Sequence, residues 1–291
     1  MPAMKAANNR FRKGLRTGIR AVLIGCGLSL FLWAGENSSR TSLIYGHDPN
    51  IKILMKGRAG NIELAASQTP AEGYTLTDYQ KGSGFVEYNR QSQELLWRSK
   101  IQFTLNRLSR YIKRVAPFMQ ASIPKGAELD LVFDMANVGI GTFNFADLHI
   151  NRIKVDVNYG DVDLVFPTPN QSIVRGVARF HLMAGDLEIY QLANLKAGKV
   201  KINGGVGELF VDFGPRLFQD MDVVIDHDIG YMELVIPKGT KALLSGTSRD
   251  LTRFHFQKVE KVWEPLVYHP NSPNLNIKLK GPLGDLVITW K

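Results

Sequence analysis

Cysteine is nearly absent from this chain of 291 residues. Its single cysteine, Cys26, excludes an intrachain disulfide and excludes zinc or iron–sulfur sites built from several cysteines. The fold must therefore be held by packing alone. Hydrophobic residues make up 44% of the sequence, which is enough for a full core and argues against disorder over most of the length.

The motifs of common catalytic sites are also missing. The chain has no Gly-x-Ser-x-Gly elbow, no phosphate-binding glycine loop and no His-Glu-x-x-His motif, and its six histidines lack metal-ligand spacing. Asp226-His227-Asp228 is the nearest approach to a ligand cluster. Alternate residues of a strand face opposite ways, so His227 would either point away from the two aspartates or lie in a turn. We expect no enzymatic activity, no cofactor and no metal site.

The net charge of +9 is unevenly distributed. Residues 1–35 hold six basic residues and no acidic one, and residues 98–114 hold six more. The rest of the chain is therefore net acidic. Since the basicity belongs to two local segments, we do not expect a general nucleic-acid surface.

The start of the chain has the order of an export signal. Residues 1–20 are basic, and residues 21–34 are an apolar run. As a helix this run is about 21 Å long, short against a hydrocarbon core of roughly 30 Å, which favours a cleaved signal. Snorkelling of Arg20 would instead allow an uncleaved, single-pass anchor. Either way residues 19–35 engage the membrane, and the positive-inside rule places the remainder outside the cytoplasm.

Leu23-Ile24-Gly25-Cys26 resembles a lipoprotein box. The strongly apolar stretch continues after the cysteine, however. We therefore favour a cysteine buried within a signal or anchor over lipidation at Cys26.

A five-residue pattern, a glycine followed by polar–apolar–polar–apolar residues, occurs seven times. We call this pattern the phrase. The copies begin at Gly60, Gly141, Gly160, Gly185, Gly207, Gly230 and Gly284. A recurrence of about 22 residues predicts stacked repeats, and the alternation predicts strands with one face buried. The glycines are expected at corners that need a positive φ or a close backbone approach. We predict an all-β, single-domain β-solenoid over residues 51–291, preceded by a linker at 36–50.

The apolar residues of each copy are predicted to fill the core. They are Ile62/Leu64, Phe143/Phe145, Val162/Leu164, Leu187/Ile189, Leu209/Val211, Met232/Leu234 and Leu286/Ile288. One coil cannot bury such a pair alone, whereas a stack of coils can.

Residues 97–119 interrupt the repeat. Apolar residues from Trp97 to Met119 recur every three or four positions, and Pro117 would end a helix. The basic residues beside this stripe are Arg98, Arg107, Arg110, Lys113 and Arg114. We predict an amphipathic helix that either covers an open sheet edge or lies on an anionic membrane or a protein partner. Residues 97–105 also alternate, which is compatible with a strand.

The polar positions of the phrase are often acidic. The candidate ridge consists of Asp161, Asp163, Asp186, Glu188, Glu208 and Glu233. Like charges about 5 Å apart repel, so a stacked ridge would favour a divalent cation or a basic partner. The alternative is an ordinary solvated strand face. A rival hypothesis is a polysaccharide-active enzyme, which needs two carboxyls that converge across a cleft.

The repeat region resembles the toast-rack domain, found in LiaF-like cell-wall-active-antibiotic response proteins and in bacterial adhesin domains of unassigned function. The matching stretches are residues 51–64, 123–131, 138–153 and 268–285. The resemblance implies an exported or membrane-anchored β-solenoid. In the LiaF-like branch it also implies regulation of a membrane sensor kinase during envelope stress. Its motif consists of glycines and strand pattern, so it transfers no catalytic residues.

Taken together, these features predict a non-enzymatic β-solenoid in the cell envelope, either membrane-anchored or secreted. We expect it to act as a stress-response or interaction module with an envelope protein partner. A surface adhesin and a polysaccharide-active solenoid enzyme are the alternatives. The exposed ends of a solenoid also permit self-association.

Overall fold

The computed structural model describes residues 41–45, 50–67, 74–78, 84–89, 91–99, 118–281 and 284–291. These residues belong to one compact unit, Arg40–Lys291. The predicted signal or anchor, with Cys26, lies outside the described residues. Within the described ranges, no helix has both the length and the apolar character needed to cross a membrane.

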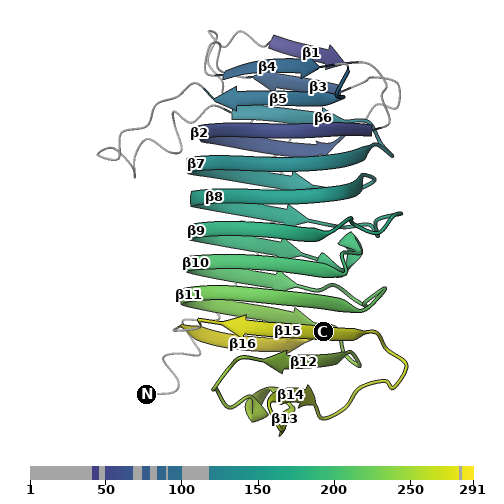
Figure 1. Cartoon of the computed structure of the whole chain (residues 1–291), viewed down its shortest axis with the longest axis vertical. Helices are drawn as coiled ribbons and strands as arrows, with labels where there is room; N and C mark the ends of the chain where they lie inside the picture. The colour runs from purple at the N-terminus through teal and green to yellow at the C-terminus, as the bar shows by residue number, and fades with distance from the viewer. Residues whose placement is uncertain are drawn as a thin grey trace. The chain divides into compact units, whose positions relative to one another are not determined.

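The body of this unit is a stack of six long strands that pair in parallel, one after the other (Figure 1). They are β2 (Asn50–Ala66), β7 (Glu128–Asn144), β8 (His149–Val165), β9 (Val177–Tyr190), β10 (Lys199–Asp212) and β11 (Met221–Ile236). All described strands join in one sheet of 16 strands, which confirms the all-β prediction.

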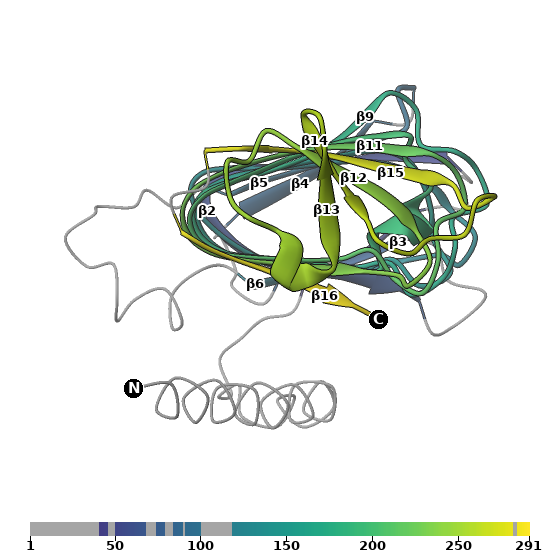
Figure 2. The same cartoon turned by 90° about the horizontal axis from the view of Figure 1, so that it is seen from below.

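Each long strand bends near its middle. We call the part before the bend its first arm and the part after the bend its second arm. Seen along the stack, the first arms form one layer and the second arms form another, and the two layers meet at the bend (Figure 2). Apolar side chains fill the space between the layers. The side chains that alternate with them face outward from each arm.

We call one pair of first and second arms a coil of the stack. A glycine occupies the bend of each of the long strands. Gly139, Gly160, Gly185, Gly207 and Gly230 pair with one another in successive coils. At Gly160, φ is +137°, and a Cβ atom would lie 1.9 Å from the carbonyl oxygen of Gly139. Gly160, Gly185, Gly207 and Gly230 all combine a positive φ with a close backbone approach, as predicted, whereas a Cβ on Gly139 would meet the side chains of Val157 and Met135.

In β7 the bend lies two residues before the glycine that the sequence predicts as the corner. Its bend glycine is Gly139, whereas Gly141 pairs with Val162 in the core layer. A Cβ at Gly141 would lie 2.3 Å from the Phe143 ring, so this second glycine leaves room for an aromatic side chain. The local pattern glycine–polar–apolar cannot distinguish these two uses of glycine.

The predicted core is confirmed, because every apolar residue assigned inward from the phrase is at most 5% exposed. Aromatic rings continue this core: the centroids of Phe143 and Phe145 lie 6.2 Å apart within one coil, and those of Phe145 and Phe166 lie 4.9 Å apart between neighbouring coils. No coil makes its core alone. Burial therefore depends on the whole stack, as in other repeat architectures.

Two buried asparagines close the loop side of the stack. The Asn170 side chain donates to Ile150 O (2.7 Å) and accepts from Ile150 N (3.0 Å). The Asn194 side chain donates to Phe166 O (2.7 Å), and its own carbonyl accepts from Asn170 N. These bonds satisfy backbone N–H and C=O groups near the ends of the strands. Asn194 itself belongs to the short helix η3 (Leu192–Leu195).

At the N-terminal end, β5 (Glu94–Ser99) pairs with the first arm of β2, and β6 (Phe118–Ile123) pairs with its second arm. Together they form a further coil. Trp97 and Met119 are both buried in these strands. The predicted helix over 97–119 is therefore wrong at both ends, because these residues extend the sheet. Residues 100–117, between the two strands, lie outside the described residues.

Antiparallel strands continue this end of the sheet. They are β4 (Gly84–Asn89) beside β5, then β3 (Tyr74–Asp78) beside β6 and β1 (Thr41–Tyr45) beside β3. Strand β1 lies inside the predicted linker 36–50, so that segment is in part structured. Within the described residues, these three strands extend the sheet beyond β5 and β6.

At the C-terminal end, β15 (Asn274–Lys280) and β16 (Asp285–Trp290) form the last coil against the two arms of β11. Beyond β15 come β12 (Lys241–Ser245), β14 (Val262–Pro265) and β13 (Phe256–Val259). The short helix η4 (Thr252–Phe254) lies against β16, where Arg253 donates to Leu286 O and the Trp290 indole donates to Phe254 O.

Candidate functional site: the carboxylate face

All six acidic residues of the predicted ridge lie on the outward side of the second arms. Asp161 pairs with Asp186 and Asp186 with Glu208, which makes one row across three coils. Asp163 and Glu188 begin a second row. That row continues through Phe210 to Glu233. We call these six acids the carboxylate face.

Charge on the second arms has one sign. The strand segments 61–66, 118–123, 140–144, 161–165, 186–190, 208–212, 231–236 and 285–290 contain no lysine, arginine or histidine. Adjacent strands lie about 4.8 Å apart, so paired carboxylates are neighbours. Mutual repulsion along each row makes a cation, or a cationic partner, favourable at this face.

Aromatic side chains lie among the acids. The Tyr190 hydroxyl donates to Glu188, and the Tyr231 hydroxyl donates to Glu233 at 3.1 Å. The rings of Tyr190 and Phe210 lie 5.1 Å apart. A surface that combines ring faces with carboxylates suits lysine and arginine side chains, because both parts attract a cation.

The environment of the face acts on two carboxyls. Partial burial raises the pKa of Asp186, and the charges of Glu208 and Asp161 raise it further. The backbone N–H of Glu208, 3.3 Å from Asp186 Oδ1, opposes this effect. Partial burial also raises the pKa of Glu63, which is outside the six but on the same outward side of β2. The ionised face is thus held at an electrostatic cost.

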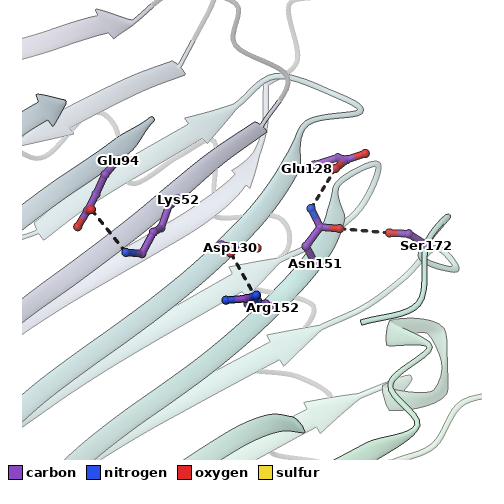
Figure 3. A network of polar contacts seen from close by, with 7 residues as sticks. All are labelled: Lys52, Glu94, Glu128, Asp130, Asn151, Arg152 and Ser172. Carbon is purple, nitrogen blue, oxygen red and sulfur yellow. Dashed lines mark hydrogen bonds and ion pairs between the residues drawn. The ribbon is translucent and has the colours of Figure 1, made fainter. Parts of the chain in front are cut away.

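The first arms show the opposite arrangement (Figure 3). Lys52 Nζ lies 3.5 Å from Glu94 on the neighbouring coil. Arg152 Nε lies 3.8 Å from Asp130, also across coils. Exposed pairs of this kind contribute at most about 1 kcal/mol each. Their value here is that opposite charges face each other on the first arms, whereas only acids gather on the second arms.

The predicted basic surface is described at one residue. Arg98 is exposed on β5, next to Lys56 of β2. Arg107, Arg110, Lys113 and Arg114 lie outside the described residues. In the chain, these four residues lie between the end of β5 at Ser99 and the start of β6 at Phe118.

His227 has a buried ring whose surroundings could not be predicted from the sequence. The sequence predicted that it faces away from Asp226 and Asp228 or lies in a turn. The structure places it in β11, where it is 1% exposed, while the two aspartates are less buried. Among the described residues, neither ring nitrogen has a hydrogen-bond partner. The ring occupies the space above Gly204, where a Cβ would lie 2.7 Å from Nδ1. Burial lowers the pKa of His227, and the Gly204 backbone and Asp228 oppose this in part.

The carboxylates of the face follow one another along the stack, and none of the six lines either of the two cavities described next. A cavity of about 710 Å³ at the C-terminal end and one of about 220 Å³ on the first arms are lined by other residues. Within the described ranges, no three His, Cys, Asp or Glu side chains are grouped so as to hold a metal ion. The lack of enzymatic activity stays a prediction.

Comparisons with known proteins place this chain far from its neighbours. No protein-family model matches it, and no curated protein matches it. A solved structure from Clostridium sporogenes, described as a candidate cell adhesion protein, has 9% identity and a TM-score of 0.37, covering 88% of this chain and 100% of that one. A candidate adhesin from Bacteroides fragilis has 13% identity and a TM-score of 0.32, covering 87% and 97%. The toast-rack resemblance therefore stays a prediction.

Proposed function

We propose that this protein is a non-enzymatic binding scaffold of the cell envelope whose carboxylate face engages a cationic partner. The observation that carries the proposal is the alignment of six acids in two rows on arms that hold no basic residue. The basic and apolar segments before residue 35 support a location outside the cytoplasm.

A rigid sheet suits this role. The bend glycines that pair from coil to coil form a glycine ladder. Because this ladder and the shared core hold the coils in register, the carboxylates keep a regular spacing without their partner. Asp186 has its pKa raised by burial and by Glu208 and Asp161, so a cation placed beside it relieves repulsion. The Tyr190–Phe210 ring pair adds a site where a guanidinium or ammonium group can stack.

The test uses a short oligo-arginine peptide and the purified full chain in detergent. Replacing one row, with Asp161→Asn, Asp186→Asn and Glu208→Gln together, should weaken binding about tenfold or more in fluorescence anisotropy. The matched control is Asp134→Asn, Asp156→Asn and Asp226→Asn on the first arms, which removes the same charge. Equal losses in both variants would mean that only net charge matters, and the carboxylate face would lose its role.

Adhesion is the second candidate, because the same face would serve if the cationic partner lay on another surface. The finer alternative, regulation of a sensor kinase during envelope stress, is implied by the LiaF-like resemblance. Fractionation of cells that carry a tagged chain separates anchored from released forms. A released or surface-exposed protein whose row variant no longer retains cells on a cationic surface supports adhesion. An anchored protein whose deletion changes an envelope-stress reporter supports regulation.

A further inference from the structure

The mixed charge of the first arms gives way to a single sign on β9 and β10. Their first arms, residues 177–184 and 199–206, hold arginine and lysine and no acidic residue. Their second arms, residues 186–190 and 208–212, hold aspartate and glutamate and no basic residue. Each of these two strands therefore carries opposite charge on its two arms.

A row of three basic side chains crosses the first arms of β8, β9 and β10. Lys154 of β8 pairs with Arg179 of β9, and Arg179 pairs with Lys201 of β10. Arg179 and Lys201 are exposed, and the residues on either side of each are buried, so both side chains point outward. Lys154 is half-buried, and its Nζ lies 2.8 Å from Asp156 Oδ2. We call Lys154, Arg179 and Lys201 the basic row.

The basic row lies on the same three strands as the row of Asp161, Asp186 and Glu208 in the carboxylate face. On each strand the acid follows the base by seven residues: 154 to 161, 179 to 186 and 201 to 208. Neighbouring coils lie about 4.8 Å apart in both arms, because the same paired strands build both. The two rows therefore have the same order and a matching spacing, on the two outward sides of the stack (Figure 2).

A second copy placed beside the first can lay its basic row on the carboxylate face. The outward sides of the two layers face opposite directions (Figure 2). A copy displaced across the stack, without rotation, thus brings its first arms to the second arms of the other. Because the two rows share one spacing, each cation meets one carboxylate without a change in the sheet. The Tyr190–Phe210 ring pair adds a surface on which Arg179 of the second copy can stack.

We propose that the cationic partner of the carboxylate face is a second copy of this chain, which docks through its basic row. The inference rests on the proposed function, because it names the partner of the same face. Each of the two surfaces needs a partner of opposite charge, and each complements the other, whereas a foreign cation would satisfy the carboxylate face alone. The contact joins two different surfaces, so it leaves one of each free and repeats from copy to copy.

Charge exchange tests the contact in the full chain, purified in detergent. The base variant carries Arg179→Glu and Lys201→Glu, and the acid variant carries Asp186→Lys and Glu208→Lys. The unaltered chain should self-associate in sedimentation velocity at low salt, and each variant alone should associate about tenfold more weakly, because like charges then meet. An equimolar mixture of the two variants should recover the association, because the acid variant keeps the basic row and the base variant keeps the carboxylate face.

Lys238→Glu with Lys261→Glu is the matched control. Both side chains are exposed and lie outside the two rows, and the change in net charge equals that of the base variant. This control should associate like the unaltered chain. The inference is overturned if the unaltered chain stays monomeric, if mixing the two variants restores nothing, or if the control loses association as the base variant does. Association that no variant alters, as a contact through residues 1–40 would give, also overturns it.

Binding of the oligo-arginine peptide separates this inference from the proposed function. The base variant keeps the carboxylate face, so it should bind the peptide as the unaltered chain does. Peptide binding without self-association would mean that the face serves a foreign cationic partner, and the second-copy inference alone would fail. If the unaltered chain binds neither the peptide nor a second copy, the proposed function fails together with the inference.

Discussion

A Cβ atom on Gly185 would lie 1.8 Å from the carbonyl oxygen of Gly160, the glycine paired with it in the neighbouring coil. The same closeness recurs from coil to coil through Gly207 and Gly230. The bends are thus stacked backbone on backbone, and this contact sets how closely the coils can approach. It follows that the ladder bears on stability more than any single outward side chain.

Gly185→Ala should lower the free energy of unfolding by about 3 kcal/mol or more, because a positive φ and a backbone clash act together. Urea denaturation followed by circular dichroism measures this loss. Gly176→Ala is the control, since Gly176 has φ of +77° but no atom within 4 Å of a Cβ. It should cost only about 1 kcal/mol. Similar losses in the two variants would show that the close approach is not what the ladder requires.

Trp97 should behave as a core residue of a strand. Trp97→Ala is expected to cost about 3–5 kcal/mol, because the buried ring covers the Gly60 bend, where a Cβ would lie 2.7 Å from it. Trp97→Phe should cost much less, since it keeps a ring and removes a buried indole N–H that has no hydrogen-bond partner among the described residues. The readout is the urea midpoint. A near-neutral Trp97→Ala would instead favour an exposed segment at this position.

His227 should make stability depend on pH. Its pKa is lowered in the folded state, so the unfolded chain binds the proton more tightly. The stability is present above the unfolded pKa of about 6.5 and is lost as the pH falls through that value toward the folded pKa. His227→Leu should remove part of the stability difference between pH 7.5 and pH 5.5. If His227→Leu leaves that difference unchanged, protonation of the buried ring is not its cause.

Asp186→Asn should raise the melting temperature at neutral pH. The pKa of Asp186 is raised in the folded chain, so ionising this carboxyl costs more free energy there than in the unfolded chain. The penalty exists above the folded pKa and disappears below the unfolded value, so the gain should vanish in acid. The asparagine Oδ1 still accepts the Glu208 N–H bond. Asp130→Asn, which removes the partner of Arg152, should instead give a neutral or lower melting temperature. A drop for Asp186→Asn at pH 7 would contradict the repulsion within the row.

Several local patterns were enough to anticipate their structure. The polar–apolar alternation after Gly160, Gly185 and Gly207 identified which residues are buried, because a strand side chain has only two directions. The alternation around His227 likewise predicted an orientation away from the two aspartates, with a turn as the alternative. The glycine corners followed from their recurrence along the chain.

Other features were out of reach of local patterns. Gly141 and Gly139 look alike in sequence, and only pairing with Gly160 identifies the bend. Trp97 and Met119 fit a helical stripe, but each completes a coil with β2, a contact between segments far apart in the chain. Tertiary pairing overrides local periodicity in such cases.

The sequence by itself determined that this protein is a stack of bent strands with apolar pairs inside, because side-chain alternation and glycine corners are properties of the local backbone. Only the tertiary structure decided the register between coils. Register is what turns Asp161, Asp186 and Glu208 into a row of like charges, and strand pairing is what makes β5 and β6 a further coil beside β2. Both depend on hydrogen bonds between distant segments, which the order of residues along one strand does not specify.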